Sequence, residues 1–456
     1  MPTPNLACKF VKALLSITAV VALGQLAFPQ STNAAAPAVQ ARSNMQYAER
    51  FTGATADEKL NAAIAALHGG GGIVDARSLE GGEVRTTIVV PAHTEVMLNP
   101  NAVYTCTIAS GPCWAITAEG GKILGGTVSF ALGSYSPATQ TGTVFRMGKG
   151  TTRMTDMIVM NPSPKPYNSV GGMEVGFVTI DNTPNASRYC ILTRSIMHSY
   201  IHDVQCYGGT NGFEFETSPN AWSYDVRLVN LFAQGATGAD FNFTTATGSG
   251  FADLDRWVCE LCKAGSSGTN EYGFAFTTGA EGKLSIADME FHNAWVGGTA
   301  PSCSAPCRSP AGVFFNQQGS GMAPYIKRIS FSGEIEQLAN RGKGKAIGLV
   351  NAGPGGAVQD IRLDVIEYGW PEEIPDFNGS SIASFEYRTT VMSRIIFPQT
   401  FESLPRCASG PGSQDGAIAT VTDAPTNVWG APIGSGGGGN NVLVRCNGRN
   451  WTIIGK

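Results

Sequence analysis

Two carboxylates and a histidine stand close together in the segment IADMEFHN, residues 286–293. Glu290 and His292 are two residues apart, so they share one face if the segment is a strand. In segments with the same pattern, Glu260 aligns with His292 and Arg227 aligns with Glu290. Hydrolysis of a glycoside needs one carboxylic acid and a second carboxylate, whereas lyase chemistry needs a base and a cation. We therefore predict Glu260, Glu290, His292 and Arg227 as catalytic residues.

Further polar residues occupy the same outward columns of the alignment, and we predict that they bind substrate: Gln205, Tyr207, Arg362 and Asp364. Glu260 with Glu290 suits hydrolysis, while His292 or Tyr207 with Arg227 suits elimination, and both alternatives stay open. Outward strand positions are normally polar, so a solvated face without chemistry is the competing interpretation.

Two other observations concern the same region of the sequence. The aromatic residues Trp222, Tyr224 and Tyr207 could stack on sugar rings, although packing under a loop is the alternative role. His202 precedes Asp203, and we favour the interpretation that it caps a strand over a catalytic role.

The elements that must position these residues repeat along the chain. Nine segments share one pattern: MTDMIVMN, VGFVTIDN, IHDVQCYG, SYDVRLVN, LDRWVCEL, IADMEFHN, IKRISFSG, VQDIRLDV and MSRIIFPQ, between residues 154 and 399. In each, the residues one and three places after the third are apolar, which is the period of a strand with one buried face. Repeated short strands with loops of unequal length predict the stacked coils of a parallel β-helix.

Two positions of the pattern are structurally informative. The eighth is asparagine or glycine in six segments, and both residue types tolerate the left-handed backbone of a tight corner, so Asn293 is predicted to be a corner residue. The third alternates in charge: Asp225, Arg256, Asp288, Arg328, Asp360 and Arg394. With coils about 4.8 Å apart, we expect a ladder of surface ion pairs, in which Asp288 is structural.

The first residues resemble an export signal. Lys9 and Lys12 precede a short apolar run and then small residues, so we expect residues 1–35 to be a signal peptide and the protein to be secreted, without a membrane span. Composition agrees: 456 residues, 57 glycines, 14% charged residues and a net charge of −4 argue against nucleic acid as a partner.

Ten cysteines follow the predicted signal, and an even number in an oxidising compartment favours disulfides over zinc. We expect the pairs Cys106–Cys113, Cys303–Cys307 and Cys407–Cys446, and a local disulfide also in WVCELC. We predict no cofactor, since no acidic cluster has the spacing of a calcium loop.

The stretch TGATADEKLNAAIAALHGGGGIVDARSLEGG, followed by TIVVPAHTEVMLNP, resembles the start of pectate-lyase-like and tailspike-like right-handed β-helix proteins. The resemblance implies a short helix that caps the first coil, and Thr55 is a suitable N-cap. The paired-aspartate and Gly-His-Gly motifs of polygalacturonases and the Trp-Ile-Asp-His motif of pectate lyases are missing, so no catalytic residue is transferred.

We therefore predict an all-β, single-stranded right-handed parallel β-helix over residues 36–405, with an N-terminal capping helix and a small C-terminal β tail over residues 406–456. We expect a secreted polysaccharide lyase or glycoside hydrolase, either a monomer or a β-helix homotrimer. The alternative is a non-catalytic glycan-binding or adhesive fibre-like protein, because fold alone does not define function.

Overall fold

The computed structural model describes most of the chain after residue 43. The described ranges are 44–126, 142–164, 168–183, 187–245, 250–265, 271–279, 283–297, 311–318, 325–336, 345–351, 357–368, 385–389, 396–404, 406–407 and 418–455. The predicted signal segment and the pair Cys303–Cys307 lie outside them. No helix in these ranges has both the length and the apolar character needed to cross a membrane.

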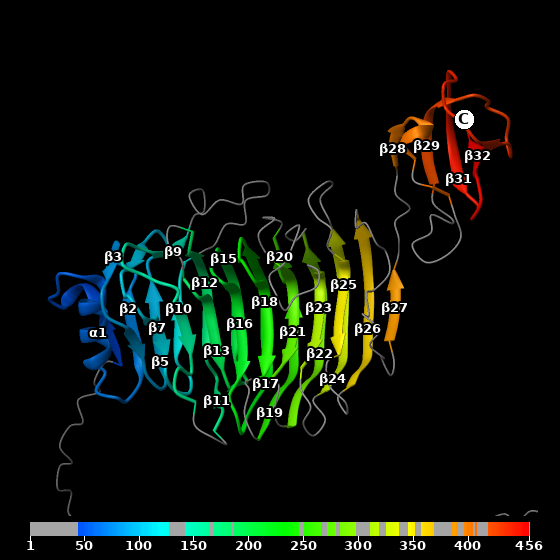
Figure 1. Cartoon of the computed structure of the whole chain (residues 1–456). Helices are drawn as coiled ribbons and strands as arrows, with labels where there is room; N and C mark the ends of the chain where they lie inside the picture. The colour runs from blue at the N-terminus through cyan, green and yellow to red at the C-terminus, as the bar shows by residue number, and fades with distance from the viewer. Residues whose placement is uncertain are drawn as a thin grey trace, which may run out of the picture. The chain divides into compact units, whose positions relative to one another are not determined.

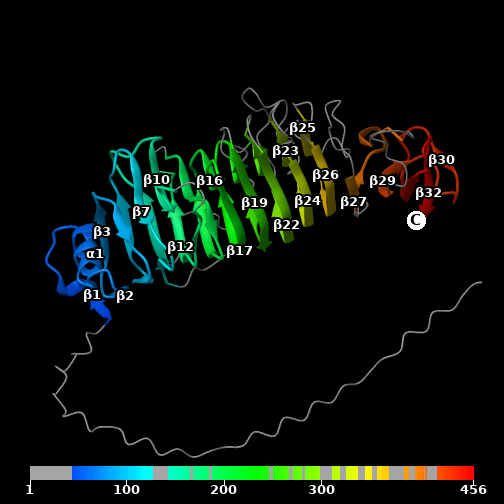
Figure 2. The same ribbon diagram turned by 90° about the horizontal axis from the view of Figure 1, so that it is seen from below.

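A short helix closes the first end of the coil stack (Figures 1 and 2). Helix α1 (Ala56–Ala65) follows the 3-10 turn η1 (Ala48–Arg50), and Thr55 is its N-cap as predicted. Glu58 completes a capping box by accepting a hydrogen bond from the Thr55 backbone N–H at 3.4 Å. The apolar face of α1, which includes Leu60 and Ile64, is buried, and the helix therefore covers the open end of the sheets.

The coils form two long parallel sheets. In the described residues the larger sheet contains β1 (Met45–Tyr47), β2 (Gly72–Ala76), β3 (Gly81–Val84), β5 (Thr94–Leu98), β6 (Val103–Cys106), β8 (Lys122–Leu124), β9 (Thr143–Met147), β11 (Val170–Gly171), β12 (Glu174–Asp181), β14 (Ile196–Met197), β15 (Tyr200–Tyr207), β17 (Ala221–Gln234), β19 (Phe251–Glu260), β20 (Lys263–Ala264), β22 (Lys283–Val296), β24 (Tyr325–Glu336), β26 (Ala357–Tyr368) and β27 (Phe385–Thr389).

The second sheet runs in the order β25 (Lys345–Asn351), β23 (Ala311–Gln317), β21 (Tyr272–Thr278), β18 (Ala239–Thr245), β16 (Asn211–Thr217), β13 (Tyr189–Arg194), β10 (Thr155–Met160), β7 (Gly111–Ile116) and β4 (Ile88–Val90). Each coil contributes strands to both sheets, and each strand pairs in parallel with the equivalent strand of the neighbouring coil. This topology confirms the right-handed parallel β-helix.

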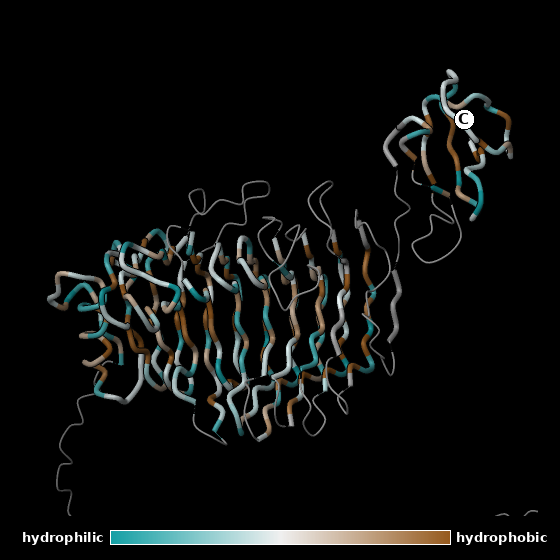
Figure 3. The backbone as a smooth tube through the Cα atoms, viewed as in Figure 1, coloured by the Kyte–Doolittle hydropathy of each residue, from teal (hydrophilic) through white to brown (hydrophobic). Residues whose placement is uncertain are grey.

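The core between the sheets is apolar and rich in aromatic rings. Phe213, Phe241 and Phe274 stack from coil to coil with centroid separations of 5.0 and 4.7 Å. Figure 3 shows the hydrophobic positions running along the coil strands. Such stacking supports the register of the coils, because each ring contacts its equivalent above and below.

The repeat pattern predicts the strands well but not every register. Seven of the nine segments lie in the larger sheet, from β12 to β26, and their two apolar positions are buried. Segments 223–230, 254–261, 286–293, 326–333 and 358–365 pair in the predicted alignment. The segment 201–208 is displaced, since Ile201 pairs with Leu228 rather than Ser223.

Two of the segments were placed wrongly. MTDMIVMN forms β10, which lies in the second sheet and is buried along its whole length, so its alternation carries no information about a face. MSRIIFPQ contributes β28 (Ile396–Gln399), which pairs with β29 (Ile418–Ala424) instead of with a coil.

The predicted corner position is left-handed, and so is the third position of the pattern, which was predicted only as a charge ladder. Asn161, Asn230 and Asn293 at the eighth position have φ values of 58°, 53° and 51°. The third-position residues Asp225, Arg256, Asp288, Arg328 and Asp360 also have φ between 52° and 55°. The outer surface of the longest coil strands therefore has three facets. The first facet lies before the third-position corner, the middle facet lies between the two corners, and the last facet follows the eighth-position corner.

The charge ladder at the third position is present as separate pairs. Arg256 Nε lies 3.1 Å from Asp225 Oδ1, and Arg328 forms a two-pronged ion pair with Asp288. Each arginine thus serves one aspartate of the column, and Asp288 has a further carboxyl neighbour that is described below.

Four disulfides are present in the described residues: Cys106–Cys113, Cys190–Cys206, Cys259–Cys262 and Cys407–Cys446. Both predicted pairs that fall within these residues are confirmed, as is the local bridge in WVCELC.

The C-terminal residues fold around a core of their own. Strands β28, β29, β31 (Asn440–Cys446), β32 (Trp451–Gly455) and β30 (Pro432–Ile433) form one sheet, and 3-10 turn η3 (Phe401–Ser403) packs beside β29. The buried residues Val421, Val444, Trp451 and Ile453 form their core with Cys446. The sheet therefore begins about ten residues before the predicted boundary at 406, because β28 belongs to it.

Candidate functional site

The first facet is hollowed because small side chains separate larger ones. Register places Ser285 between Asp253 and Tyr325 in one outward column, and Ala287 between Asp255 and Lys327 in the next. Trp222 and Tyr224 precede Asp253 and Asp255 on the adjoining strand β17. The depression on β22 is therefore flanked by aspartates on one side and by an aromatic and a lysine on the other.

Three hollows share lining residues and form one groove, which we call the aspartate groove. The central hollow, of about 480 Å³, is lined by Phe251, Asp253, Asp255, Asp288 and Tyr325 among others. A hollow of about 410 Å³ adjoins it at Trp222 and Tyr224, and one of about 640 Å³ extends over the corner to the middle facet. An extended chain molecule fits such a surface better than a compact ligand does.

Two carboxyl groups meet in this groove from adjacent coils. Burial, together with a hydrogen bond from Asp255 to Asp288 and their mutual repulsion, raises the pKa of Asp255 to about 6. Oδ1 of Asp255 is buried and accepts no hydrogen bond from the described donors. Two ionised carboxylates cannot bond to each other, so Asp255 and Asp288 share a proton up to about that pH.

The neighbours of the pair assign the proton to Asp255. The guanidinium of Arg328 lowers the pKa of Asp288, despite the opposing effect of burial. Burial also raises the pKa of Asp253, while the charge of Lys327 opposes that shift. The groove thus holds a protonated acid, Asp255, beside Asp288, which Arg328 keeps ionised.

The predicted catalytic cluster is assembled, but on the exposed middle facet. Glu260 pairs in register with His292, as expected from the alignment. Arg227 Nη2 lies 3.3 Å from Glu260 Oε1, and His292 Nε2 lies 3.1 Å from Glu290 Oε2. All four side chains are largely exposed, and only Arg227 and Glu290 contribute to the lining of the aspartate groove.

The predicted substrate-binding residues divide into two groups. Arg362 and Asp364 are exposed and continue the outward columns of the middle facet. Gln205 and Tyr207 are only 1% and 3% exposed, and the Tyr207 hydroxyl donates to Gln205 at 3.1 Å. Their register displacement moves them out of the Arg227 column, so the expected place of this pair in that column is wrong.

His202 is held within the structure. Its two ring nitrogens lie 2.9 Å from Asp203 and 3.1 Å from Glu174, and the ring stacks on Tyr200 at 4.2 Å. Only 6% of the side chain is exposed, and Lys122 lies 2.7 Å from Glu174. Both nitrogens are occupied by carboxylates, which supports the predicted structural role.

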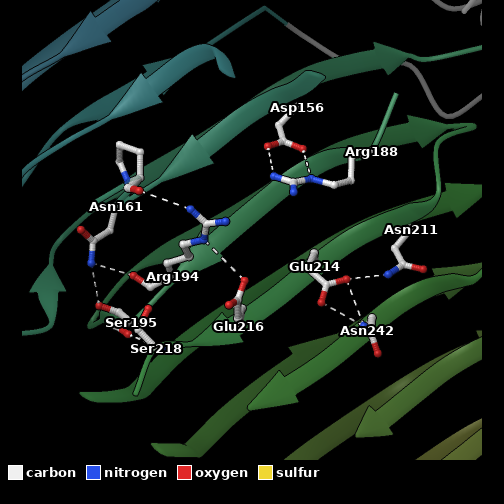
Figure 4. A network of polar contacts seen from close by, with 11 residues as sticks. Asp156, Asn161, Arg188, Arg194, Ser195, Asn211, Glu214, Glu216, Ser218 and Asn242 are labelled. Carbon is white, nitrogen blue, oxygen red and sulfur yellow. Dashed lines mark hydrogen bonds and ion pairs between the residues drawn. The ribbon is translucent and has the colours of Figure 1, made fainter. Parts of the chain in front are cut away.

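The outer face of the second sheet carries a separate polar network (Figure 4). Asp156 pairs with Arg188 at 2.7 Å, and Glu216 with Arg194 at 3.4 Å. Glu214 is 4% exposed, and burial raises its pKa to about 7. Asn211 and Asn242 donate to its carboxyl group at 2.6 and 2.9 Å, so this group is enclosed and bonded.

The described residues contain no cluster of three or more histidine, cysteine, aspartate or glutamate side chains arranged to hold a metal ion. The carboxyl groups of the aspartate groove are suited to acid–base chemistry.

The site is carried by a right-handed parallel β-helix, and comparisons concern that fold. No protein-family model and no curated protein matches the chain. Among solved structures it is similar to the A-module of Azotobacter vinelandii mannuronan C-5 epimerase AlgE6, with 11% identity, 75% of this chain and 98% of that chain covered, and a TM-score of 0.34. Tailspike protein 3 of bacteriophage CBA120 matches with 12% identity, coverages of 80% and 65%, and a TM-score of 0.30.

The Streptococcus pneumoniae surface adhesin PfbA matches with 9% identity, coverages of 71% and 90%, and a TM-score of 0.27. The fold assignment rests on the topology of the chain itself, and the function must be argued from the groove.

Proposed function

We propose that this protein is a glycoside hydrolase that cleaves an extended polysaccharide in the aspartate groove. The observation that carries the proposal is the carboxyl pair of Asp255 and Asp288, in which Asp255 keeps its proton to about pH 6 in an accessible hollow. A carboxylic acid with a raised pKa is what a glycosidase needs to protonate the leaving oxygen.

Asp255 is the general acid and Asp253 the general base of this mechanism. They are two residues apart on one face of β19, so their Cα atoms are roughly 6.6 Å apart. An inverting mechanism requires about 6.5–9.5 Å between the two carboxyl groups, with room for a water molecule, and this is the arrangement that we propose for Asp255 and Asp253. Asp255 gives its proton to the glycosidic oxygen, and Asp253 takes a proton from the water that attacks the anomeric carbon.

Asp288 and Arg328 are positioning residues. Arg328 keeps Asp288 ionised, and ionised Asp288 holds the proton on Asp255 through their hydrogen bond and charge. Loss of the Asp288 charge should lower the pKa of Asp255 and move the acid limb of the pH profile.

The aromatic residues of the groove supply sugar binding. Trp222 is 39% exposed and packs at 4.8 Å against Phe251, which lines the central hollow. Tyr325 lines that hollow across the small residues Ser285 and Ala287. Rings at both sides of the acid could stack on sugars on either side of the cleaved bond.

An extracellular location is part of the proposal. The four disulfides support it, because such bonds persist in oxidising compartments. The N-terminal signal segment predicted from the sequence would provide export.

The test is to incubate the purified protein with polysaccharides and to measure reducing ends and the anomeric configuration of the first product by NMR. We expect reducing ends with inverted configuration, and loss of both in Asp253→Asn. Glu216→Gln, which removes a carboxylate on the other sheet, is the matched control and should retain activity. Product formation that survives Asp253→Asn would refute the assignment of the base.

The cluster of Arg227, Glu260, Glu290 and His292 is the second candidate site. The contact of His292 with Glu290 at 3.1 Å would make the imidazole a stronger base, as elimination requires. In that case the absorbance of unsaturated uronates should appear and should be abolished by His292→Ala. Binding without any product, unchanged in the variants, would instead support an adhesive role.

A further inference from the structure

We infer that the substrate of the aspartate groove is a neutral polysaccharide, without carboxylate or sulfate groups on the sugars that occupy the groove. This inference rests on the proposed hydrolase function and names its substrate class. It follows from the charges that line the groove and from the partners to which those charges are bound.

The charges of the groove balance. The described residues that line its three hollows include five carboxyl groups, Asp225, Asp253, Asp255, Asp288 and Glu290, and four cations, Arg227, Arg256, Lys327 and Arg328. One proton on Asp255 makes the lining neutral. A groove that binds a polyanion is expected to have an excess of positive charge, which attracts the chain and offsets its self-repulsion.

The guanidinium groups of the groove are already bound to carboxylates. Arg328 makes two hydrogen bonds to Asp288, and Arg256 lies 3.1 Å from Asp225. Arg227 lies 3.3 Å from Glu260. A uronate carboxylate would have to displace one of these partners and leave an aspartate without its cation in the groove, which is unfavourable.

Lys327 is the remaining cation, and its surroundings are acidic. Its ammonium lies 5.1 Å from the centroid of the Tyr325 ring, and its charge stabilises the ionised forms of Asp253 and Asp288. An anionic sugar at Lys327 would therefore also face both aspartates. The repulsion between the anionic sugar and these two aspartates would exceed its attraction to the single lysine.

The aromatic residues of the groove also favour a neutral sugar as the ligand. Trp222, Tyr224, Phe251 and Tyr325 line its hollows. Neutral sugars present faces of C–H groups that stack on such rings, with hydroxyl groups left for the aspartates. A neutral sugar also has no carboxylate to acidify the neighbouring proton, so elimination is excluded and hydrolysis is the remaining cleavage.

The experiment compares polymers that differ only in charge. A neutral glucan, galactan and mannan are each tested beside the same polymer oxidised at C6 to the uronate, and binding to full-length Asp255→Asn is measured by affinity electrophoresis. We expect at least one neutral polymer to bind at least 10-fold more tightly than its oxidised form. Equal or tighter binding of the oxidised forms, or no binding of any neutral form, would overturn the inference.

A second variant tests whether the pairing of the arginines with carboxylates causes the preference for a neutral polymer. Asp225→Asn in the same background releases Arg256, and the preference for the neutral polymer should fall several-fold. Glu216→Gln releases Arg194 on the other sheet and should leave the preference unchanged. Binding is read without cleavage, so a protein that binds neutral polymer but releases no product would contradict the hydrolase proposal alone.

Discussion

Asp255 and Glu214 are both carboxyl groups with a raised pKa on outer faces of the coil stack, and their surroundings differ in every other respect. Glu214 is enclosed, and amide groups of Asn211 and Asn242 bond its oxygens. Asp255 lines an open hollow, has an oxygen without a described donor, and contacts a second carboxyl group.

The difference separates two uses of a buried acid. The amide donors satisfy Glu214 in place, which makes it a structural link between strands β16 and β18. The proton of Asp255 is held by burial and by the neighbouring carboxylate, and Asp255 lines the open groove, so we propose that a substrate oxygen takes this proton. A raised pKa alone therefore does not identify a catalytic acid.

The largest expected effect is on turnover. Asp255→Asn removes the transferable proton, and we expect kcat to fall by about 10²- to 10⁴-fold, the usual contribution of general acid catalysis. Glu214→Gln, which removes a proton from the other buried acid, should keep kcat within a small factor. Equal losses in both variants, measured as initial rates of reducing-end release, would erase the distinction.

The free energy of unfolding should depend on pH chiefly through Glu214. Its pKa is raised from 4.5 to about 7 in the folded protein, so the folded state binds the proton more tightly and stability falls as the pH rises from 4.5 to 7. The full shift corresponds to about 3 kcal/mol. Urea unfolding across this range should show a shallower fall in Glu214→Gln, with the remainder from Asp240, Asp253 and Asp255, whose pKa values are also raised.

Activity should begin to fall near pH 6, below the pH of about 7 at which the loss of stability from Glu214 is complete. Asp255 loses its proton above about pH 6, so kcat should decline from there while the fold remains intact. Asp288→Asn should move this decline, since it removes the charge that holds the proton. A decline of kcat at the same pH in both proteins would show that another group limits the rate.

Truncation of the two acids should separate them by stability. Glu214→Ala leaves the amides of Asn211 and Asn242 without their acceptor, which should cost about 1–3 kcal/mol. Asp255→Asn removes carboxyl repulsion and should leave the free energy of unfolding unchanged or higher. Urea unfolding at pH 7 checks both, and a large loss in Asp255→Asn would give it the structural role assigned to Glu214.

The smallest effect is expected on the middle facet. The exposed contact of His292 with Glu290 should contribute about 0–1 kcal/mol to stability. Because His292 does not line the described hollows of the groove, His292→Ala should leave kcat/KM nearly unchanged. A loss above 100-fold would move the catalytic site to the residues first predicted from the sequence.

The fold was predictable because its cause is local. Alternating apolar residues and asparagine or glycine corners repeat in the sequence, and the coils follow them, as Asn161 and Asn230 illustrate. The register of Gln205 and Tyr207 was not predictable: Ile201 pairs with Leu228, five residues from the predicted partner Ser223, and the alternation of the segment alone does not reveal this shift. β10 failed for another reason: a strand buried on both sides has no informative face.

The groove was only partly visible in the sequence. Trp222 and Tyr224 were named as residues that could stack on sugars or pack under a loop, and they line the groove. Asp288 was predicted to be part of an ion pair, which is confirmed. The contact of Asp288 with Asp255 depends on how two coils stack and on how deeply the carboxyl groups are buried. The spacing of residues in the sequence reveals neither. The available signal was the run of Asp253 and Asp255 beside the small residues Ser285 and Ala287 one coil further on.

The acid and the residue that holds its proton belong to different turns of the chain, on β19 and β22. The proposed turnover therefore requires these two neighbouring coils to stay stacked in register. A shift or separation of the two coils would abolish that activity while nearly all of the secondary structure remained. Spectroscopic melting and inactivation would then occur at different temperatures.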